Sequence, residues 1–447
     1  MAEDVLIIGG GLAGLAAGVA LAEAGCRVRL LEQKPYLGGR ARSFRDAATG
    51  SIVDNGQHLF MGCYHATLKF LDAIGTADAI SFDPQLRVRF LDSNKKLTEL
   101  RCPSFPAPWH LLAGVCLSDS FTLGEKMDVL RLGRALRTAK DANDSTGVLD
   151  HMTVEEWLSA LGQRESLRRN FWDLLCIAAM NEDPEITSAL LFRRVLRLAL
   201  FSSPLDSRLG IPCKGLSDCY TDTAARAITG RGGSVELRRD VRALLVSNGV
   251  CHGVKLADGA VIEAQIVLSA APWHVLPGLL PADVVKSEPA FSRILDLRPA
   301  PIISIYIWFD RPVTDLEFVG LRGTTVQWLF NKGSILGSGE NYISLVLSGA
   351  HRHVERSKED LLEMALIELR NLLPGMRDAR LTHSLVIKER FATFSPCVGV
   401  DALRPSAATP IRGLYLAGDW TDTGLPATIE GAVQSGYTAA EAILHPN

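Results

Sequence analysis

The chain has little net charge and no regular cysteine pattern. Its formal charge is −3 over 447 residues, whereas a protein whose main partner is nucleic acid has a clearly basic surface. Its nine cysteines are irregularly spaced and include no Cys-x-x-Cys pair, which argues against a disulfide framework and against a zinc site. We therefore expect a protein that binds no nucleic acid and no metal.

The sequence also lacks long apolar runs. A membrane-spanning helix needs ~18 consecutive apolar residues, and the longest candidate, residues 266–281, is interrupted by His274 and three prolines. Because a strand-like segment already begins at Val5, we expect no signal or transit peptide before it. These absences predict a cytoplasmic protein, either free or in peripheral contact with the inner face of the cytoplasmic membrane.

The start of the chain has the pattern of a dinucleotide-binding unit. Gly9, Gly11 and Gly14 form a GxGxxG motif between an apolar run and a helical pattern, and a second apolar run ends on Glu32. In such a motif the first glycine permits a tight turn, the second lets the backbone approach a pyrophosphate, and the third lets the helix pack close to the strand. Glu32 is placed to accept hydrogen bonds from ribose hydroxyls. A glycine-rich turn without a ligand is the alternative, and it leaves the second strand and its acid unexplained.

Two later segments bear on which dinucleotide is bound. Gly39 and Arg40 follow the ribose acid closely, and a guanidinium there can pair with the pyrophosphate; the alternative is a basic surface turn. Near the C-terminus an apolar run ends on Gly418 and Asp419, and Pro426 then leads into a further helix. Asp419 can hold a ribityl or phosphate-linked hydroxyl, and the N-terminus of that helix can face the pyrimidine edge of a flavin.

Together these motifs resemble those of the FAD-dependent amine oxidase and phytoene desaturase superfamily. The resemblance is carried by GGGLAGLAAG, by Glu32, by GGRARS, by DNGQH at 54–58, and by LAGDW with LPATIEGAV. Within the superfamily, the blocks at 53–68, 171–192 and 211–220 resemble the hydroxysqualene dehydroxylases of bacterial hopanoid pathways. This match runs nearly from end to end of the chain.

The resemblance implies an α/β fold like that of other amine oxidase-like flavoproteins. A Rossmann-type FAD-binding domain is assembled from discontinuous segments and accompanied by an α+β substrate domain. A chain of 447 residues is long enough for two or three domains. We predict the FAD-binding domain in residues 1–80, 210–285 and 385–447, and the substrate-binding domain in residues 81–209 and 286–384.

The resemblance also assigns residues to the cofactor. Val241 would offer backbone groups to the adenine, although an ordinary core position in a strand is the alternative. Ala270 and Ala271 would lie beside the cofactor at the end of a returning strand. The full predicted set is Gly9, Gly11, Leu12, Ala13, Gly14, Glu32, Gln33, Gly39, Arg40, Asn55, Gly56, Gln57, His58, Val241, Ala270, Ala271, Gly418, Asp419, Ala427, Thr428 and Ile429.

The activity implied by the resemblance is reduction of hydroxysqualene to squalene, with reduced FAD as the hydride donor. Such a reaction needs a proton for the leaving hydroxyl. His58 is our candidate for the donor because imidazole titrates near neutrality. Asp54, Tyr64 and Glu430 are alternatives, and a role limited to shaping the flavin pocket is the other interpretation of His58.

Three other functions share the cofactor motifs. A carotenoid or phytoene-type desaturase would use every FAD residue named above and run the flavin in the opposite direction. An amine oxidase usually places aromatic residues and a lysine near the flavin, and the sequence shows Trp420 but no assignable lysine. A non-catalytic flavin-binding protein is the third alternative, because cofactor motifs do not prove turnover.

A long-chain isoprenoid substrate is barely soluble, so we expect an apolar tunnel and contact with a bilayer. Residues 105–117 are apolar and include Trp109, and residues 190–201 mix leucine and phenylalanine with three arginines. A basic amphipathic helix can lie on anionic lipid. The alternative is an amphipathic helix that packs on the protein's own core.

Overall fold

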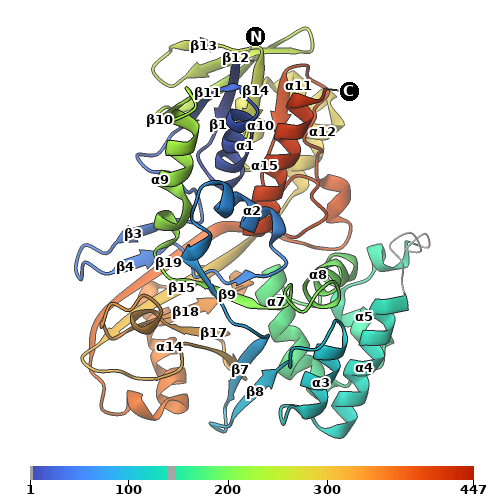
Figure 1. Ribbon diagram of the computed structural model, residues 1–447, viewed down its shortest axis with the longest axis vertical. Coiled ribbons are helices and arrows are strands. Elements are labelled where there is room, and N and C mark those ends of the chain that lie inside the picture. The colour runs from blue at the N-terminus through green and yellow to red at the C-terminus, as the bar shows by residue number, and fades with distance from the viewer. Residues whose placement is uncertain (1–3, 139–146, 447) are drawn as a thin grey trace.

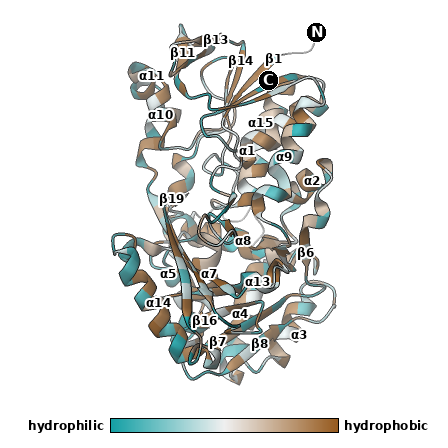
Figure 2. Cartoon of the chain, turned by 90° about the vertical axis from the view of Figure 1, so that its left-hand side faces the viewer, coloured by the Kyte–Doolittle hydropathy of each residue, from teal (hydrophilic) through white to brown (hydrophobic). Residues whose placement is uncertain are grey.

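The computed structural model describes residues 4–138 and 147–446. It has two parts, each built on its own large sheet (Figure 1). Both chain ends lie in the upper part in Figure 1, and Figure 2 shows the termini and the helix α3 at opposite ends of the molecule. Within the two described ranges, no helix is long and apolar enough to cross a membrane.

A parallel sheet forms the centre of the upper part. Its strands are short apolar runs, as expected for strands that are covered on both faces. In spatial order they are β10 (Ser234–Leu237), β2 (Arg27–Glu32), β1 (Asp4–Ile8), β14 (Ile266–Ser269) and β20 (Leu414–Leu416), and every neighbouring pair is parallel. The Rossmann-type α/β fold class predicted from the sequence is therefore confirmed, while the predicted domain boundaries stay predictions.

Glycine allows two helices of this part to approach closely. These helices are α1 (Leu12–Glu23) and α15 (Ile429–Leu444). A Cβ atom on Gly436 would lie 2.4 Å from the Ala13 carbonyl oxygen and 3.0 Å from the Ala17 nitrogen, which is closer than packed atoms can come. The contact holds the start of α1 against the C-terminal segment of the chain.

A small antiparallel sheet lies beside the parallel one. It contains β11 (Val241–Ser247), β12 (Val250–Leu256) and β13 (Val261–Glu263). The first two strands are joined by Asn248 and Gly249, which have φ values of 51° and 70°. Positive φ at both positions is what a tight two-residue hairpin turn requires, and asparagine followed by glycine meets this requirement.

The lower part is built on a seven-stranded mixed sheet. Its longest strand pair is antiparallel and consists of β15 and β19. In spatial order the strands are β19 (Leu381–Phe394), β15 (Pro299–Phe309), β18 (Tyr342–Leu347), β17 (Trp328–Asn331), β16 (Phe318–Arg322), β7 (Arg87–Asp92) and β8 (Leu97–Arg101).

Helices pack against this sheet. Helix α14 (Lys358–Leu372) buries Leu361, Ala365 and Leu369 in one core cluster with the alternate isoleucines of β15, as the helical spacing of these residues predicts. A second cluster joins strand residues to the helices α3 (Trp109–Leu117), α4 (Leu123–Thr138), α5 (Val154–Ala160), α7 (Asp173–Met180) and α8 (Ala189–Phe201).

Shorter elements connect the two parts or cover their edges. The strands among them are β3 (Ser43–Arg45), β4 (Ile52–Asp54), β5 (Phe60–Met61), β6 (Ile80–Phe82) and β9 (Leu209–Pro212). The short helices are α2 (His65–Ala73), α6 (Glu165–Leu167), α10 (Leu276–Leu279), α11 (Ala282–Ser287), α12 (Pro289–Ser292) and α13 (Lys332–Ile335). The longer helix α9 (Leu216–Thr229) packs beside α1 in the core of the upper part.

Candidate functional site

A cavity of about 1580 Å³ lies between the two parts and is lined by residues of both. From the upper part it receives the turn between β1 and α1, the segment 55–59, and the start of α15. From the lower part it receives apolar side chains of the sheet and of α3, α4, α7 and α8. The cavity therefore joins a polar, glycine-rich region to an apolar one.

The predicted cofactor residues gather in this cavity. All of them line it except Gly14, which packs against the backbone of the glycine turn. The segments that carry them are distant in the sequence and meet because β1, β14 and β20 are neighbours in the sheet. The contact of each residue with the cofactor stays a prediction.

The glycine turn has the geometry that the motif predicts. Gly9 has φ +102°, and a Cβ atom on Gly14 would lie 2.0 Å from the Gly9 carbonyl oxygen. A Cβ atom on Gly11 would meet nothing within 4 Å, although Gly11 lines the cavity. The first turn of α1 begins at this open position and has no side-chain cap, so its backbone N–H groups suit an anion.

Glu32 supports the same turn. It is 7% exposed, and its Oε2 accepts a hydrogen bond from the Gly10 N–H at 2.7 Å. Its Oε1 accepts one from the Lys34 N–H at 2.8 Å. Each carboxylate oxygen can accept more than one hydrogen bond, so the predicted contact with ribose hydroxyls is compatible with these backbone contacts.

An ion pair links the N-terminal and C-terminal segments at the cavity wall. Arg40 Nη2 lies 2.7 Å from Asp419 Oδ1, and Arg40 Nη1 donates a hydrogen bond to the Ala392 carbonyl oxygen at 2.6 Å. Both charged residues line the cavity. Because Asp419 neutralises part of the guanidinium charge, Arg40 can lie beside a phosphate group while remaining partly buried.

The candidate proton donors differ in their surroundings. Burial lowers the pKa of His58 to about 4, an effect that Asp54 opposes and Arg40 and Lys332 strengthen. The imidazole is therefore neutral at physiological pH and a poor acid. The side chain of Glu430 accepts hydrogen bonds from the backbone N–H groups of Ala66 and Thr67 at the start of α2, at 2.8 and 2.9 Å.

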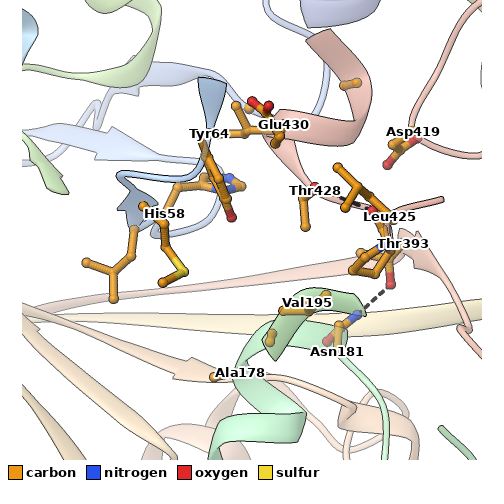
Figure 3. A pocket seen from close by; sticks show the side chains of 18 of the residues that line it. His58, Tyr64, Ala178, Asn181, Val195, Thr393, Asp419, Leu425, Thr428 and Glu430 are labelled. Carbon is orange, nitrogen blue, oxygen red and sulfur yellow. Dashed lines mark hydrogen bonds between the residues drawn. The ribbon is translucent and has the colours of Figure 1, made fainter. Parts of the chain in front are cut away.

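Tyr64 presents a hydrogen-bond donor to the cavity. Burial raises the pKa of its phenol well above the usual 10, and Cys63 and Glu430 add to this effect. The phenol therefore stays protonated. Figure 3 shows its hydroxyl end directed into the cavity beside His58, while Glu430 lies behind it at the start of α15.

Asp54 is held away from the cavity by a buried lysine. Its Oδ2 lies 2.9 Å from Lys332 Nζ, and both side chains are 0% exposed. Its Oδ1 accepts hydrogen bonds from Ser43 Oγ at 2.7 Å and from the Leu216 N–H at 3.1 Å. Sequence reasoning found no lysine near the flavin, and Lys332 lines no part of this cavity; it supports the segment that precedes His58.

Asn181 was missed by sequence reasoning, although it lies in the block at 171–192. Its side chain donates hydrogen bonds to the Ala300 carbonyl oxygen at 3.0 Å and to Thr393 Oγ1 at 2.8 Å, and accepts one from the Gly349 N–H at 2.8 Å. It lines the cavity at the end of α7 (Figure 3). The only sequence signal is an asparagine that directly follows an apolar helical run.

The arginine-containing segment 190–201 lies entirely within the helix α8. Leu191, Phe192 and Leu196 are buried, and Arg193 is only 5% exposed. Several other residues of α8 line the cavity. This packing favours the interpretation that the segment is an amphipathic helix on the protein's own core.

Comparison with known proteins agrees with this geometry. A family model described as flavin containing amine oxidoreductase matches residues 12–444. The chain is 30% identical to a hydroxysqualene dehydroxylase from Rhodopseudomonas palustris over 99% of each chain, and 27% identical to a 15-cis-phytoene desaturase from Synechococcus elongatus over 98% of this chain and 95% of that one. The structure resembles an oxidoreductase from Methanosarcina mazei with a TM-score of 0.76 at 18% identity, over 98% of this chain and 100% of the other.

The residues present fit the FAD that this family binds. Gly11 leaves space where a pyrophosphate would approach the backbone, and Arg40 supplies a cation at the same cavity. The Oε1 atom of Gln57 is buried at the cavity and has no hydrogen-bond partner within the described ranges, so it is an acceptor that a bound N–H or O–H group would satisfy. The protein is an FAD-dependent oxidoreductase and belongs to the flavin-containing amine oxidoreductase family.

Proposed function

We propose that this enzyme converts hydroxysqualene to squalene in bacterial squalene and hopanoid biosynthesis. In the reaction the C–O bond breaks, the hydroxyl takes up a proton and leaves as water, and the carbon receives a hydride. Reduced FAD, when bound, would supply that hydride, and the proton that it gives up on oxidation balances the one that the leaving hydroxyl takes up. The proposal is supported by relatives named hydroxysqualene dehydroxylase that are 28–30% identical over nearly the whole chain.

The single observation that carries the proposal is the apolar region of the cavity. It is continuous with the region that the cofactor residues line, so a bound isoprenoid can reach the cofactor while its chain stays out of water. Residues lining the apolar region include Leu86, Val88, Phe90, Leu100, Leu111, Val115, Leu132, Phe171, Leu175 and Leu198.

Exclusion of water also serves the chemistry. When an allylic hydroxyl leaves, the substrate carbon becomes cationic, and any nearby water would restore the alcohol. Apolar side chains around the substrate prevent that side reaction. The protein therefore binds the isoprenoid and protects the reacting carbon with the same residues.

We infer that Tyr64 binds the leaving hydroxyl. Its phenol faces the cavity and stays protonated, so the raised pKa makes it a hydrogen-bond donor rather than an acid, whereas the Glu430 carboxylate is engaged at the start of α2. A hydrogen bond from Tyr64 to the substrate oxygen would strengthen as that oxygen departs. Such a bond stabilises the transition state more than the bound substrate.

The variant Tyr64→Phe tests this role. We expect squalene formation to slow by about 100-fold, a typical effect of removing one positioned hydrogen-bond donor to the transition state, with unchanged FAD content. The matched variant His58→Gln should stay within about threefold of the parent rate, since the neutral imidazole is not an acid and the glutamine amide keeps a hydrogen-bond donor at that position. Single-turnover rates with hydroxysqualene distinguish the two. A normal rate in Tyr64→Phe, or a large loss in His58→Gln alone, would reverse the assignment.

The reaction itself is tested with the purified protein. We expect that chemical reduction under anaerobic conditions, followed by addition of hydroxysqualene, reoxidises the flavin and yields one squalene per flavin. A phytoene-type desaturase would instead bleach the oxidised flavin when phytoene is added. A flavin-binding protein without this activity would give neither signal.

A further inference from the structure

Large apolar side chains are exposed on the adjacent helices α3 and α4 and on the residues just before them. We call this surface the α3–α4 face. Its members are Phe105, Trp109, Leu117, Leu123, Met127 and Leu130, which are between 36% and 80% exposed. Folded proteins seldom leave so many large apolar side chains in water on one pair of helices unless the surface has a partner.

The exposed side of α4 changes from apolar to basic along the helix. Leu123, Met127, Leu130, Arg134 and Arg137 are all exposed and recur at intervals of four and three residues, so they lie along one side of the helix. The apolar members come first and the arginines follow. A surface of this kind matches the boundary of an anionic bilayer, where apolar side chains enter the lipid and guanidinium groups meet phosphates.

The same face contains a mouth of the cavity. Trp109 on α3 and Leu130, Arg134 and Arg137 on α4 line the cavity and are also exposed to solvent. Residues with both properties mark where a cavity opens. The apolar region of the cavity therefore reaches the surface between α3 and α4, among the exposed apolar side chains.

We propose that the α3–α4 face docks on an anionic lipid bilayer, and that the isoprenoid enters the cavity there directly from the hydrocarbon. The identity of the isoprenoid rests on the proposed function, whereas docking does not. The arginines beside the mouth specify a negatively charged lipid surface as the partner. Docking in this position removes the need for an insoluble substrate to cross water.

Vesicle binding tests the proposal with the full-length, FAD-loaded protein and no substrate. We expect the protein to sediment with vesicles of phosphatidylcholine and phosphatidylglycerol, and less with phosphatidylcholine alone. The variant Leu117→Ser/Leu123→Ser/Met127→Ser changes exposed residues that do not line the cavity. It should bind anionic vesicles at least tenfold more weakly, yet turn over detergent-solubilised hydroxysqualene at the parent rate.

A matched control changes three exposed apolar residues that lie outside the α3–α4 face. Val261, Leu295 and Ile367 are 55%, 62% and 52% exposed, and their replacement by serine should leave vesicle binding unchanged. Equal loss in both triple variants, or no loss in the first, overturns the proposal. So does a dimer in light scattering that the first variant converts to a monomer. Because docking is measured without substrate, it can succeed even if hydroxysqualene yields no squalene.

Discussion

The variant Gly14→Ala is expected to be colourless. Its Cβ atom would lie 2.0 Å from the Gly9 carbonyl oxygen and 3.3 Å from the Ala270 Cβ atom, so it cannot be accommodated without a shift of the backbone of the turn. The turn must open, and the first N–H groups of α1 then leave the position that suits a pyrophosphate. We expect FAD affinity to fall at least tenfold, which corresponds to about 1.4 kcal/mol of binding free energy.

Flavin absorbance relative to protein absorbance measures this effect, with circular dichroism to verify folding. Gly25→Ala is the matched control. Gly25 lies in the same βαβ unit, between α1 and β2, and has φ +90°, but a Cβ atom there would meet nothing within 4 Å. Left-handed strain alone should lower stability by about 1 kcal/mol and leave the FAD content unchanged. If the Gly14→Ala protein kept its full FAD content, the glycine turn would not be part of the cofactor site.

The variant Lys332→Met is expected to lose more stability than any surface change. It would leave the Asp54 carboxylate fully buried, and the hydrogen-bond donors that remain to it in the described part of the chain, Ser43 Oγ and the Leu216 N–H, are both neutral. Removing one partner of a buried ion pair costs about 3–5 kcal/mol because the remaining charge is uncompensated. Since Asp54 precedes the cavity residues Asn55 to His58, FAD should also bind less tightly.

The double variant Lys332→Met/Asp54→Asn separates charge from packing. It leaves no charge at the two positions of the buried pair, so we expect it to recover a large part of the lost thermal stability. As a control, Arg27→Met breaks an ion pair with Asp4 whose side chains are 68% and 60% exposed, and it should cost less than about 1 kcal/mol. A Lys332→Met protein that melts like the Arg27→Met protein would contradict the argument.

Features with a local signal were the ones that the sequence could predict. The glycine turn, its helix and Glu32 lie within one short segment, and each has a residue type that its conformation requires. Arg40 and Asp419 were each placed at the cofactor from the motif around them, and both line the cavity. Their direct ion pair was not predicted, because no sequence pattern near either residue indicates a contact with the other.

Residue type alone could not rank the candidate acids. His58 was favoured because free imidazole titrates near neutrality, but its pKa depends on burial, which is a property of the whole fold. Glu430 was an alternative until its contacts with α2 were known, and these join residues more than 360 positions apart. The buried ion pair of Lys332 and Asp54 likewise joins residues 278 positions apart, so no local sequence pattern predicts it.

The ion pair between Arg40 and Asp419 spans 379 positions of the chain, and this has a consequence for biosynthesis. While the ribosome is still translating, β20 and α15 do not yet exist, so the nascent polypeptide lacks one wall of its pigment site. The prosthetic group can be captured only after nearly the whole message has been read. A premature stop codon that removes Gly418, Asp419 and the start of α15, all of which line the cavity, would therefore release apoprotein rather than a weakened holoenzyme.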